Sequence, residues 1–234
     1  MNASIIFKDV TKAYGAGDHA FLALDRASFS IRAGEFVVVL GPSGAGKSTL
    51  LNLLGGMDFA TSGEILVGGE NIVGLSDDKL SAYRARNVGF VFQFYNLIPM
   101  LTAIENIALT RDIVKDALDA GDVLASVGLA DHAAQFPSQL SGGEQQRVSI
   151  ARAVAKNPMM LLCDEPTGAL DSETGVLILK MLKDMSRIQG KIVVIVTHNA
   201  ILADAADRVI RIKNGKINEI RENASPQDIG ALEW

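Results

Sequence analysis

The sequence of 234 residues is long enough for one domain with a sizeable hydrophobic core. Hydrophobic residues make up 48% of the chain and charged residues 21%, a composition of globular rather than disordered proteins. The net charge of −5, without a block of Lys and Arg, argues against a duplex-DNA-binding protein, which needs a basic face to meet phosphates, so no nucleic acid partner is expected.

Short runs rich in β-branched and aromatic residues, separated by turns rich in Gly and Asp, predict strands in the first third of the chain. Three runs are apolar at every position, which is typical of strands buried on both faces in a parallel sheet. These are Phe36–Leu40, Met159–Cys163 and Ile192–Val196. The other early strands are predicted at Ile5–Val10, Ala27–Ile31 and Glu64–Val67.

Helical patterns lie between these strands. Lys47–Gly55 follows the first buried run, and Thr174–Ile188 carries an apolar stripe at helical spacing. Further helices are predicted at Gly142–Ala155 and between Thr102 and His132, the latter broken near Gly121 and Gly128. The middle of the chain therefore reads as a helical insertion between two segments of a sheet.

The end of the chain contains a hairpin signal. Val209–Lys213 and Lys216–Ile220 flank Asn214-Gly215, the pair favoured in a type I′ turn. The polar residues after Glu222 are expected to form a loosely held tail. Together the elements predict an α/β fold, with a mixed sheet, an N-terminal antiparallel β lobe and a helical subdomain. We expect one domain over residues 1–222, with the helical subdomain at about 94–157 and the tail at 223–234.

A phosphate-binding motif follows the first buried strand and opens a helix. It comprises Gly41, Pro42, Ser43, Gly44, Ala45, Gly46, Lys47, Ser48 and Thr49. The pattern Gly-x-x-x-x-Gly-Lys-Ser in this strand–loop–helix context indicates a P-loop (Walker A), whose backbone N–H groups and helix dipole surround phosphates. Lys47 is expected to neutralise the β- and γ-phosphates, Ser48 to bind Mg²⁺, and Thr49 to contact the α-phosphate. By itself the motif predicts only a nucleotide-binding protein.

Two carboxylates end the second apolar strand. Asp164 suits a residue that holds Mg²⁺ through water, and Glu165 suits the residue that polarises an attacking water. An ordinary acidic turn at the end of a strand is the alternative. The P-loop earlier in the chain favours the catalytic interpretation.

A second helix start has unusual glycines. Ser141 and Glu144 have the spacing of a capping box, which explains these two residues without any ligand. Gly142 and Gly143 are poor helix formers in a first turn, and a close approach of phosphate to the backbone explains them better. One chain thus carries two phosphate-binding helix starts, which can serve one nucleotide only by folding together or by meeting across a dimer.

The run Leu140–Gln145 resembles the signature motif of ABC ATPases. This resemblance implies an ABC ATPase fold with a P-loop NTPase core, and a nucleotide-dependent homodimer of C₂ symmetry. In such a dimer the P-loop of one copy and Ser141, Gly142 and Gly143 of the other enclose each ATP. An active ATPase that uses ATP and Mg²⁺ is implied.

Four further positions resemble functional residues of the same family. Tyr14 resembles the aromatic residue that stacks on adenine, and Gln93 the glutamine that binds Mg²⁺ and senses the membrane partner. Asp171 resembles the aspartate that crosses the dimer interface, and His198 the histidine that contacts the γ-phosphate and orients the water of Glu165. A tyrosine of the core or of a turn, a surface glutamine at the end of a strand and a local turn cap are the alternatives for the first three.

Longer segments resemble one subfamily, that of the MacB and LolD-type ATPases of lipoprotein release, macrolide export and antimicrobial-peptide resistance. They are Leu51–Asp58, Phe90–Asn106 and Cys163–Asp171. The resemblance implies a separate transmembrane permease, with the ATPase in the cytoplasm at the inner face of the membrane. The apolar run Phe94–Leu101 suits a groove for the permease, with core packing as the alternative.

Three other functions compete with a transporter ATPase. An FtsE-like cell-division regulator would use the same ATP cycle and is barely distinguishable from sequence. A soluble ABC ATPase of DNA repair would carry coiled-coil heptads or zinc-binding cysteines, which the sequence lacks, and one of iron–sulfur assembly is disfavoured by Phe92–Leu97. A P-loop kinase outside the family is disfavoured by the signature and by His198.

Overall fold

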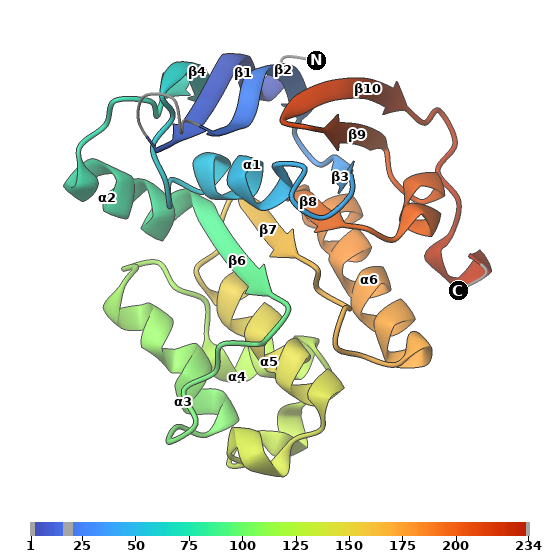
Figure 1. The fold of residues 1–234 in the computed structure, drawn as a ribbon. Coiled ribbons are helices and arrows are strands. Elements are labelled where there is room, and N and C mark those ends of the chain that lie inside the picture. Colours follow the sequence, from blue (N-terminus) through green and yellow to red (C-terminus); the bar gives the residue numbers. More distant parts are fainter. Residues whose placement is uncertain (1–2, 16–20, 233–234) are drawn as a thin grey trace.

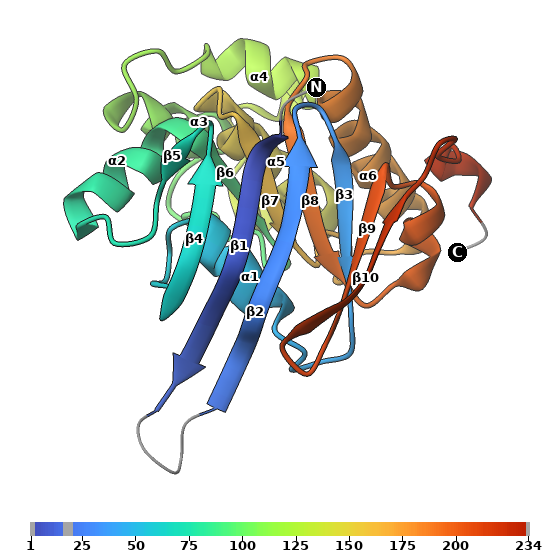
Figure 2. The same cartoon turned by 90° about the horizontal axis from the view of Figure 1, so that it is seen from above.

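The computed structural model describes residues 3–15 and 21–232. Within them the strands form two sheets (Figures 1 and 2). The antiparallel sheet has the order β2-β1-β4-β5, with β1 (Ala3–Tyr14), β2 (Phe21–Arg32), β4 (Ser62–Val67) and β5 (Glu70–Asn71). The predicted antiparallel lobe is therefore present, and its first two strands are longer than expected. Register shifts between β1 and β2 let their pairing continue to Tyr14 and Phe21.

The second sheet has six strands in the order β10-β9-β3-β8-β7-β6. They are β3 (Phe36–Leu40), β6 (Val88–Phe92), β7 (Met160–Asp164), β8 (Ile192–Thr197), β9 (Arg208–Lys213) and β10 (Lys216–Glu222). The five strands from β9 to β6 are parallel, and β10 pairs with β9 in antiparallel fashion. The sheet is mixed, as predicted, because the Asn214-Gly215 hairpin adds its last strand; both turn residues have positive φ, as type I′ requires.

Alternate residues of β3 enter two different cores. Val37 and Val39 pack with the antiparallel sheet and with α1 (Lys47–Leu54), whereas Phe36, Val38 and Leu40 pack with the helices on the opposite face. Figure 1 shows α1 between the two sheets, and α5 and α6 on the far side of the six-stranded sheet. Full burial of both faces explains why the predicted strand is apolar at every position.

Most of the remaining helical elements lie between β6 and β7 in the sequence. They are α2 (Asp77–Asn87), α3 (Ala103–Ala108), α4 (Ala120–Ser126), α5 (Gly142–Ala155) and α6 (Ser172–Arg187), with short 3₁₀ turns η2 (Leu109–Asp112), η3 (Ala130–His132), η4 (Pro137–Gln139), η5 (Ala200–Asp204) and η6 (Ile229–Ala231). None of the helices in residues 3–15 and 21–232 combines the length and apolar character that a bilayer span requires.

The helix break expected near Gly121 is present, but it lies just before this residue and not at it. Gly121 lies in the first turn of α4, where Asp119 Oδ1 accepts the backbone N–H groups of Gly121 at 2.8 Å and Asp122 at 3.1 Å. The helical pattern is instead interrupted before Asp119, and α4 ends just before Gly128, as predicted. Aspartate as an N-cap compensates for a glycine at a position where glycine weakens the helix.

The expectation of a loosely held tail is wrong for residues 223–232. Ile229 is fully buried in the core beside α6. Gln227 donates its N–H to Asp204 O at 2.9 Å and accepts a bond from Lys183 Nζ at 2.6 Å. The local sequence is polar, but Ile229 and Leu232 both enter this core, and the two bonds of Gln227 hold the backbone.

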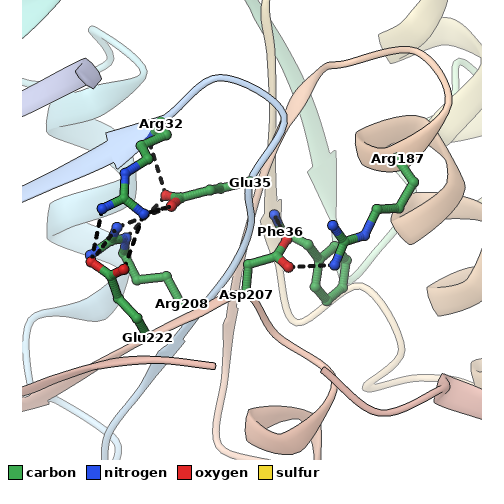
Figure 3. A network of polar contacts seen from close by, with 7 residues as sticks. All are labelled: Arg32, Glu35, Phe36, Arg187, Asp207, Arg208 and Glu222. Carbon is green, nitrogen blue, oxygen red and sulfur yellow. Dashed lines mark hydrogen bonds and ion pairs between the residues drawn. The ribbon is translucent and has the colours of Figure 1, made fainter. Parts of the chain in front are cut away.

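An ion-pair network fixes the amino ends of β3 and β9, opposite the edge from which the P-loop emerges (Figure 3). Arg208, only 4% exposed, donates from Nε and Nη2 to the two carboxylate oxygens of Glu35, each at 3.0 Å. Arg32 and Glu222 extend the cluster. Asp207 accepts the N–H of Phe36 at 2.8 Å and pairs with Arg187 of α6. Strands distant in sequence are thereby aligned before they reach the other edge.

The docked tail yields a stability prediction. Ile229→Ala removes fully buried methyl groups and should lower the free energy of unfolding by about 2–4 kcal/mol in urea titrations followed by circular dichroism. Ile220→Ala, at a side chain 42% exposed on β10, is the matched control and should change it far less. Equal stability of Ile229→Ala and the parent protein would contradict the docking.

Candidate nucleotide site

A cavity of about 660 Å³ lies where β6, β7 and β8 end and the P-loop begins. Most of the residues proposed from the sequence line it, together with Phe21, Ala23, Phe92, Phe94 and Asn96. The proposed residues that line it are Tyr14, Ser43, Gly44, Gly46, Lys47, Ser48, Thr49, Gln93, Asp164, Glu165 and His198. The carboxyl ends of parallel strands share one edge of the sheet, which brings these residues together.

The P-loop is packed tightly against its neighbours. A Cβ at Gly46 would lie 2.3 Å from Ala23 O of β2, and φ at Gly46 is 106°. A Cβ at Gly41 would lie 2.3 Å from Ile212 O of β9. Both positions therefore require glycine, and both fix the loop relative to the two sheets. Gly41, Pro42 and Ala45 belong to the loop but are not among the described residues that line the cavity.

Lys47 bends back over the loop that precedes it. Its side chain is largely buried, and Nζ donates to Gly41 O at 2.8 Å and to Pro42 O at 3.0 Å. These carbonyls hold the ammonium at the cavity wall. A lysine ammonium has three donors, and two of them are used here. The remaining donor and the positive charge are therefore held in place for a phosphate that enters the cavity.

Oxygen donors suited to a divalent cation share the cavity. Burial raises the pKa of the Asp164 carboxyl, as does the charge of Glu165, while Ser48 and Lys47 partly oppose this rise. A cation beside Asp164 would stabilise its ionised form. Among the described residues, no group of three or more His, Cys, Asp or Glu side chains is arranged to hold a metal. The set Ser48, Gln93 and Asp164 nevertheless fits Mg²⁺, which is bound by few protein oxygens and keeps water and phosphate ligands.

The Glu165 carboxylate is held by donors from the end of β8. Oε1 accepts the His198 N–H at 3.0 Å and contacts His198 Nδ1 at 2.8 Å, and Oε2 accepts the Thr197 hydroxyl at 2.9 Å. Glu165 itself has a φ of 49°, unusual for a residue other than glycine. Thr197 was not proposed from the sequence, and its position directly before His198 was the only available signal.

Tyr14 and Gln93 lie at the cavity wall. Tyr14 is 43% exposed, and its hydroxyl donates to Asp58 Oδ2 at 2.6 Å. Phe21, its partner in the β1–β2 register, is 60% exposed and lines the same cavity. Gln93 packs closely on Gly168: a Cβ added at Gly168 would lie 2.9 Å from Gln93 Nε2. The Asp58 contact was not predicted from the sequence.

The residues proposed to act from the second copy do not line the cavity of their own chain. Ser141 caps α5 in a capping box with Glu144, whose Oε2 accepts the Ser141 hydroxyl and N–H, each at 2.8 Å. His132, for which no role was predicted, has its Nε2 3.3 Å from Glu144 Oε1. Asp171 caps α6, accepting the Thr174 N–H at 2.9 Å.

The two glycines at the start of α5 have neighbours within the chain. A Cβ at Gly142 would lie 2.8 Å from Tyr95 Oη, and one at Gly143 would lie 2.3 Å from Thr174 Cγ2. Close packing on the segment after β6 and on α6 is therefore a second physical reason for glycine, beside the phosphate contact expected from the sequence. Ser141 is exposed in this chain, so another molecule can reach it.

Comparisons with known proteins agree with this geometry. Residues 24–168 match the model of the ABC transporter family. An uncharacterised ABC transporter ATP-binding protein of Methanocaldococcus jannaschii is 44% identical over 222 residues, which cover 91% of this chain and 94% of that protein. One of Mycobacterium tuberculosis is 45% identical over 216 residues, covering 89% and 87%.

Some relatives are longer than this chain. A putative ABC transporter ATP-binding protein of Mycoplasma genitalium is 41% identical, and the match covers 98% of this chain but 50% of that protein. A macrolide export ATP-binding/permease protein MacB of Rhodopirellula baltica is 42% identical, and the match covers 94% of this chain but 34% of that protein. The chain thus spans only part of these relatives.

A solved structure of the M. jannaschii protein has the same fold. It is a dimeric post-hydrolysis state bound to ADP and Pi, 42% identical in sequence, with a TM-score of 0.85 over 93% of this chain and 98% of that one. The family match covers more than half of the chain and includes the P-loop and the run Leu140–Gln145. The protein therefore belongs to the ABC transporter family, as one of its ATP-binding cassettes.

Proposed function

We propose that this chain is the ATP-binding and ATP-hydrolysing subunit of an ABC transporter. The observation that carries the proposal is the Glu165 carboxylate, fixed by Thr197 and His198 in the cavity that the P-loop lines. The solved relative bound to ADP and Pi supports hydrolysis. We also propose that residues 1–222 form one domain, with a helical subdomain at about 94–157 inserted in it, and that residues 223–234 form a C-terminal segment.

The phosphates of ATP would be bound by the P-loop. Backbone N–H groups of the loop and the start of α1 donate to the phosphate oxygens, and Lys47 neutralises charge on the β- and γ-phosphates. Ser48, Gln93 and Asp164 would hold Mg²⁺, which supplies further charge neutralisation. Thr49 faces the α-phosphate, and Tyr14 stacks on the base.

The reaction is in-line attack of water on the γ-phosphate. Glu165 accepts a hydrogen bond from the attacking water and polarises it. Because a carboxylate only accepts, the contact between Glu165 and His198 requires a proton on Nδ1. His198 Nε2 can then donate to a γ-phosphate oxygen when the imidazole carries its second proton. Thr197 keeps the carboxylate oriented while the water is held.

A second copy of the chain completes each site. Ser141, Gly142, Gly143, Glu144 and Asp171 are outside the cavity of their own chain, and an arrangement with two-fold symmetry would bring them to the γ-phosphate of the partner. The dimeric relatives support this assembly. The helix start at Ser141 then contributes N–H groups to charge that develops during hydrolysis.

The partner in the membrane is proposed to be a permease of the MacB or LolD type. Support comes from the MacB relative, named as an ATP-binding/permease protein, and from the exposed side chains of Phe94, Ile98 and Met100 in the segment after Gln93. These apolar side chains suit a contact with a permease helix. The chain would act in the cytoplasm at the inner face of the membrane. An FtsE-like regulator of cell division remains the second candidate, because it uses the same site.

Glu165→Gln tests the catalytic role directly. The amide keeps the size of the side chain but loses the charge that polarises water, so kcat should fall by about 100-fold or more. ATP should still bind and, without hydrolysis, hold two copies together. Steady-state phosphate release and light scattering after size exclusion measure both effects, with Glu219→Gln on β10 as control. A Glu165→Gln protein that stays monomeric in saturating Mg-ATP would contradict the proposal.

Ser141→Arg tests the contribution of the second copy. The large cation should block the approach of the partner, so that hydrolysis falls at least about tenfold while the Kd for ATP stays within about twofold. Thr102→Arg is the matched control, since Thr102 forms an equivalent capping box on α3. Loss of ATP binding in Ser141→Arg would refute the assignment of Ser141 to the site of the other copy.

Thr197→Val tests the orientation of Glu165. The substitution keeps the shape but removes the hydroxyl that donates to Glu165 Oε2, so kcat should fall about three- to tenfold at unchanged ATP affinity. Thr110→Val removes a hydroxyl at an equally buried position, 3% exposed in both cases, and controls for the loss of a buried hydrogen bond. Similar kcat values for the two variants would rule out this role.

A further inference from the structure

Two residues that contact Tyr14, Lys12 and Asp58, are not among the described residues lining the nucleotide cavity. Its hydroxyl donates to Asp58 Oδ2 at 2.6 Å. Lys12 Nζ lies 4.6 Å from the centroid of the Tyr14 ring, a cation–π distance. The ring is therefore fixed at its edge by a carboxylate and on one face by an ammonium, which leaves only the other face for stacking.

Lys12 and Asp58 also fix each other. Lys12 Nζ donates to Asp58 Oδ1 at 2.6 Å and to Phe59 O at 2.8 Å, and the Phe59 N–H donates to Asp58 Oδ1 at 2.7 Å. Both side chains are shielded, with 11% of Lys12 and 23% of Asp58 exposed. Pairs of this kind are screened less by solvent than the exposed pair of Lys8 with Glu64 on the same sheet, at 55% and 51%.

The protonation states suit this arrangement. Burial would raise the pKa of the Asp58 carboxyl, but bonds from Lys12, Tyr14 and the Phe59 N–H outweigh it and lower the pKa. Burial and the neighbouring Asp58 raise the pKa of the Tyr14 phenol, so it keeps its proton. Tyr14 thus donates to an ionised acceptor, the stronger type of hydrogen bond.

Asp58 connects Tyr14 to the helix that starts at the P-loop. α1 opens at Lys47 and ends at Leu54, and Asp58 lies in the turn that follows it. The segment that follows Asp58 is also bonded to β1, since Thr61 Oγ1 accepts the Ala13 N–H at 2.9 Å and the Thr61 N–H donates to Thr11 O at 2.8 Å. One short helix therefore sets both the position of the phosphate loop and the position of the Tyr14 ring.

We infer that Lys12 and Asp58 are positioning residues for nucleotide recognition, which fix the Tyr14 ring in the orientation that stacks on the base. This inference rests on the proposed function, in which Tyr14 contacts the base of ATP. Neither residue is among the described residues that line the cavity proposed for the phosphates and the attacking water. The pair therefore contributes to the recognition of a nucleotide base, and not to the binding of a bare polyphosphate.

The test separates base recognition from phosphate recognition. In Asp58→Ala the ring loses its anchor, and the KM for ATP should rise about fivefold with kcat within about twofold, because a hydrogen bond to a charged group is lost without change at the reacting atoms. The Ki of inorganic tripolyphosphate, which has no base, should not change. Glu64→Ala, which breaks the exposed Lys8 pair on the same sheet, is the control and should alter neither constant.

A second variant keeps the test valid if Asp58→Ala folds poorly. Tyr14→Phe removes only the hydroxyl and leaves the pair of Lys12 and Asp58 intact, and it should raise the KM for ATP to a similar extent. In the double variant the KM for ATP should not exceed the higher of the two KM values of the single variants, because both changes remove the hydrogen bond between Tyr14 and Asp58. Additive effects in the double variant would overturn the inference.

Two further outcomes distinguish the failures. If Tyr14→Ala raises the KM for ATP but Asp58→Ala behaves like Glu64→Ala, the positioning role is overturned and the base contact stands. If Tyr14→Ala leaves the KM unchanged, the base contact itself is overturned, and the positioning role with it. A Ki for tripolyphosphate that rises with the KM for ATP in Asp58→Ala would show distortion of the P-loop, and would also overturn the inference.

Discussion

The parallel pairing of fully buried strands is the constraint on which the rest of the structure depends. β6, β7, β8 and β3 are hydrogen-bonded in one register, with Phe92 opposite Asp164, Asp164 opposite Val196, and Leu40 opposite Thr197. The residue after each strand therefore emerges at the same edge. The strand pairing thereby brings together Gln93, Glu165, His198 and the P-loop, which are far apart in sequence.

That edge concentrates charge which the fold only partly compensates. Asp164 and Glu165 are adjacent, and burial raises the pKa of Asp164. Glu165 is supplied with donors by Thr197 and His198, whereas Lys47 is bonded to carbonyls of its own loop. The carboxylate that would polarise water is thus oriented in advance, and the cavity is suited to a ligand that brings a cation with its phosphates.

The starts of α5 and α6, which lie outside the cavity, are capped by residues of the same chain. Ser141 and Asp171 each satisfy a helix end within the chain, and Gly142 and Gly143 admit Tyr95 and Thr174. A cassette of this kind can fold as a single chain and still present its signature to a second copy. In the proposed dimer the same residues would serve folding and assembly through different contacts, so the capping alternatives and the proposed roles are compatible.

The sequence by itself determined the strands buried on both faces, the P-loop, the Asn214-Gly215 hairpin and the family, because these signals are local in the chain. Only the tertiary structure decided that Thr197 holds Glu165, that Asp58 holds Tyr14, and that the segment after Glu222 docks through Ile229. Each of these contacts joins residues of different elements; Tyr14 and Asp58, for example, are 44 positions apart. No local pattern encodes such a pair, since a polar side chain finds its partner only after the sheets and helices have packed.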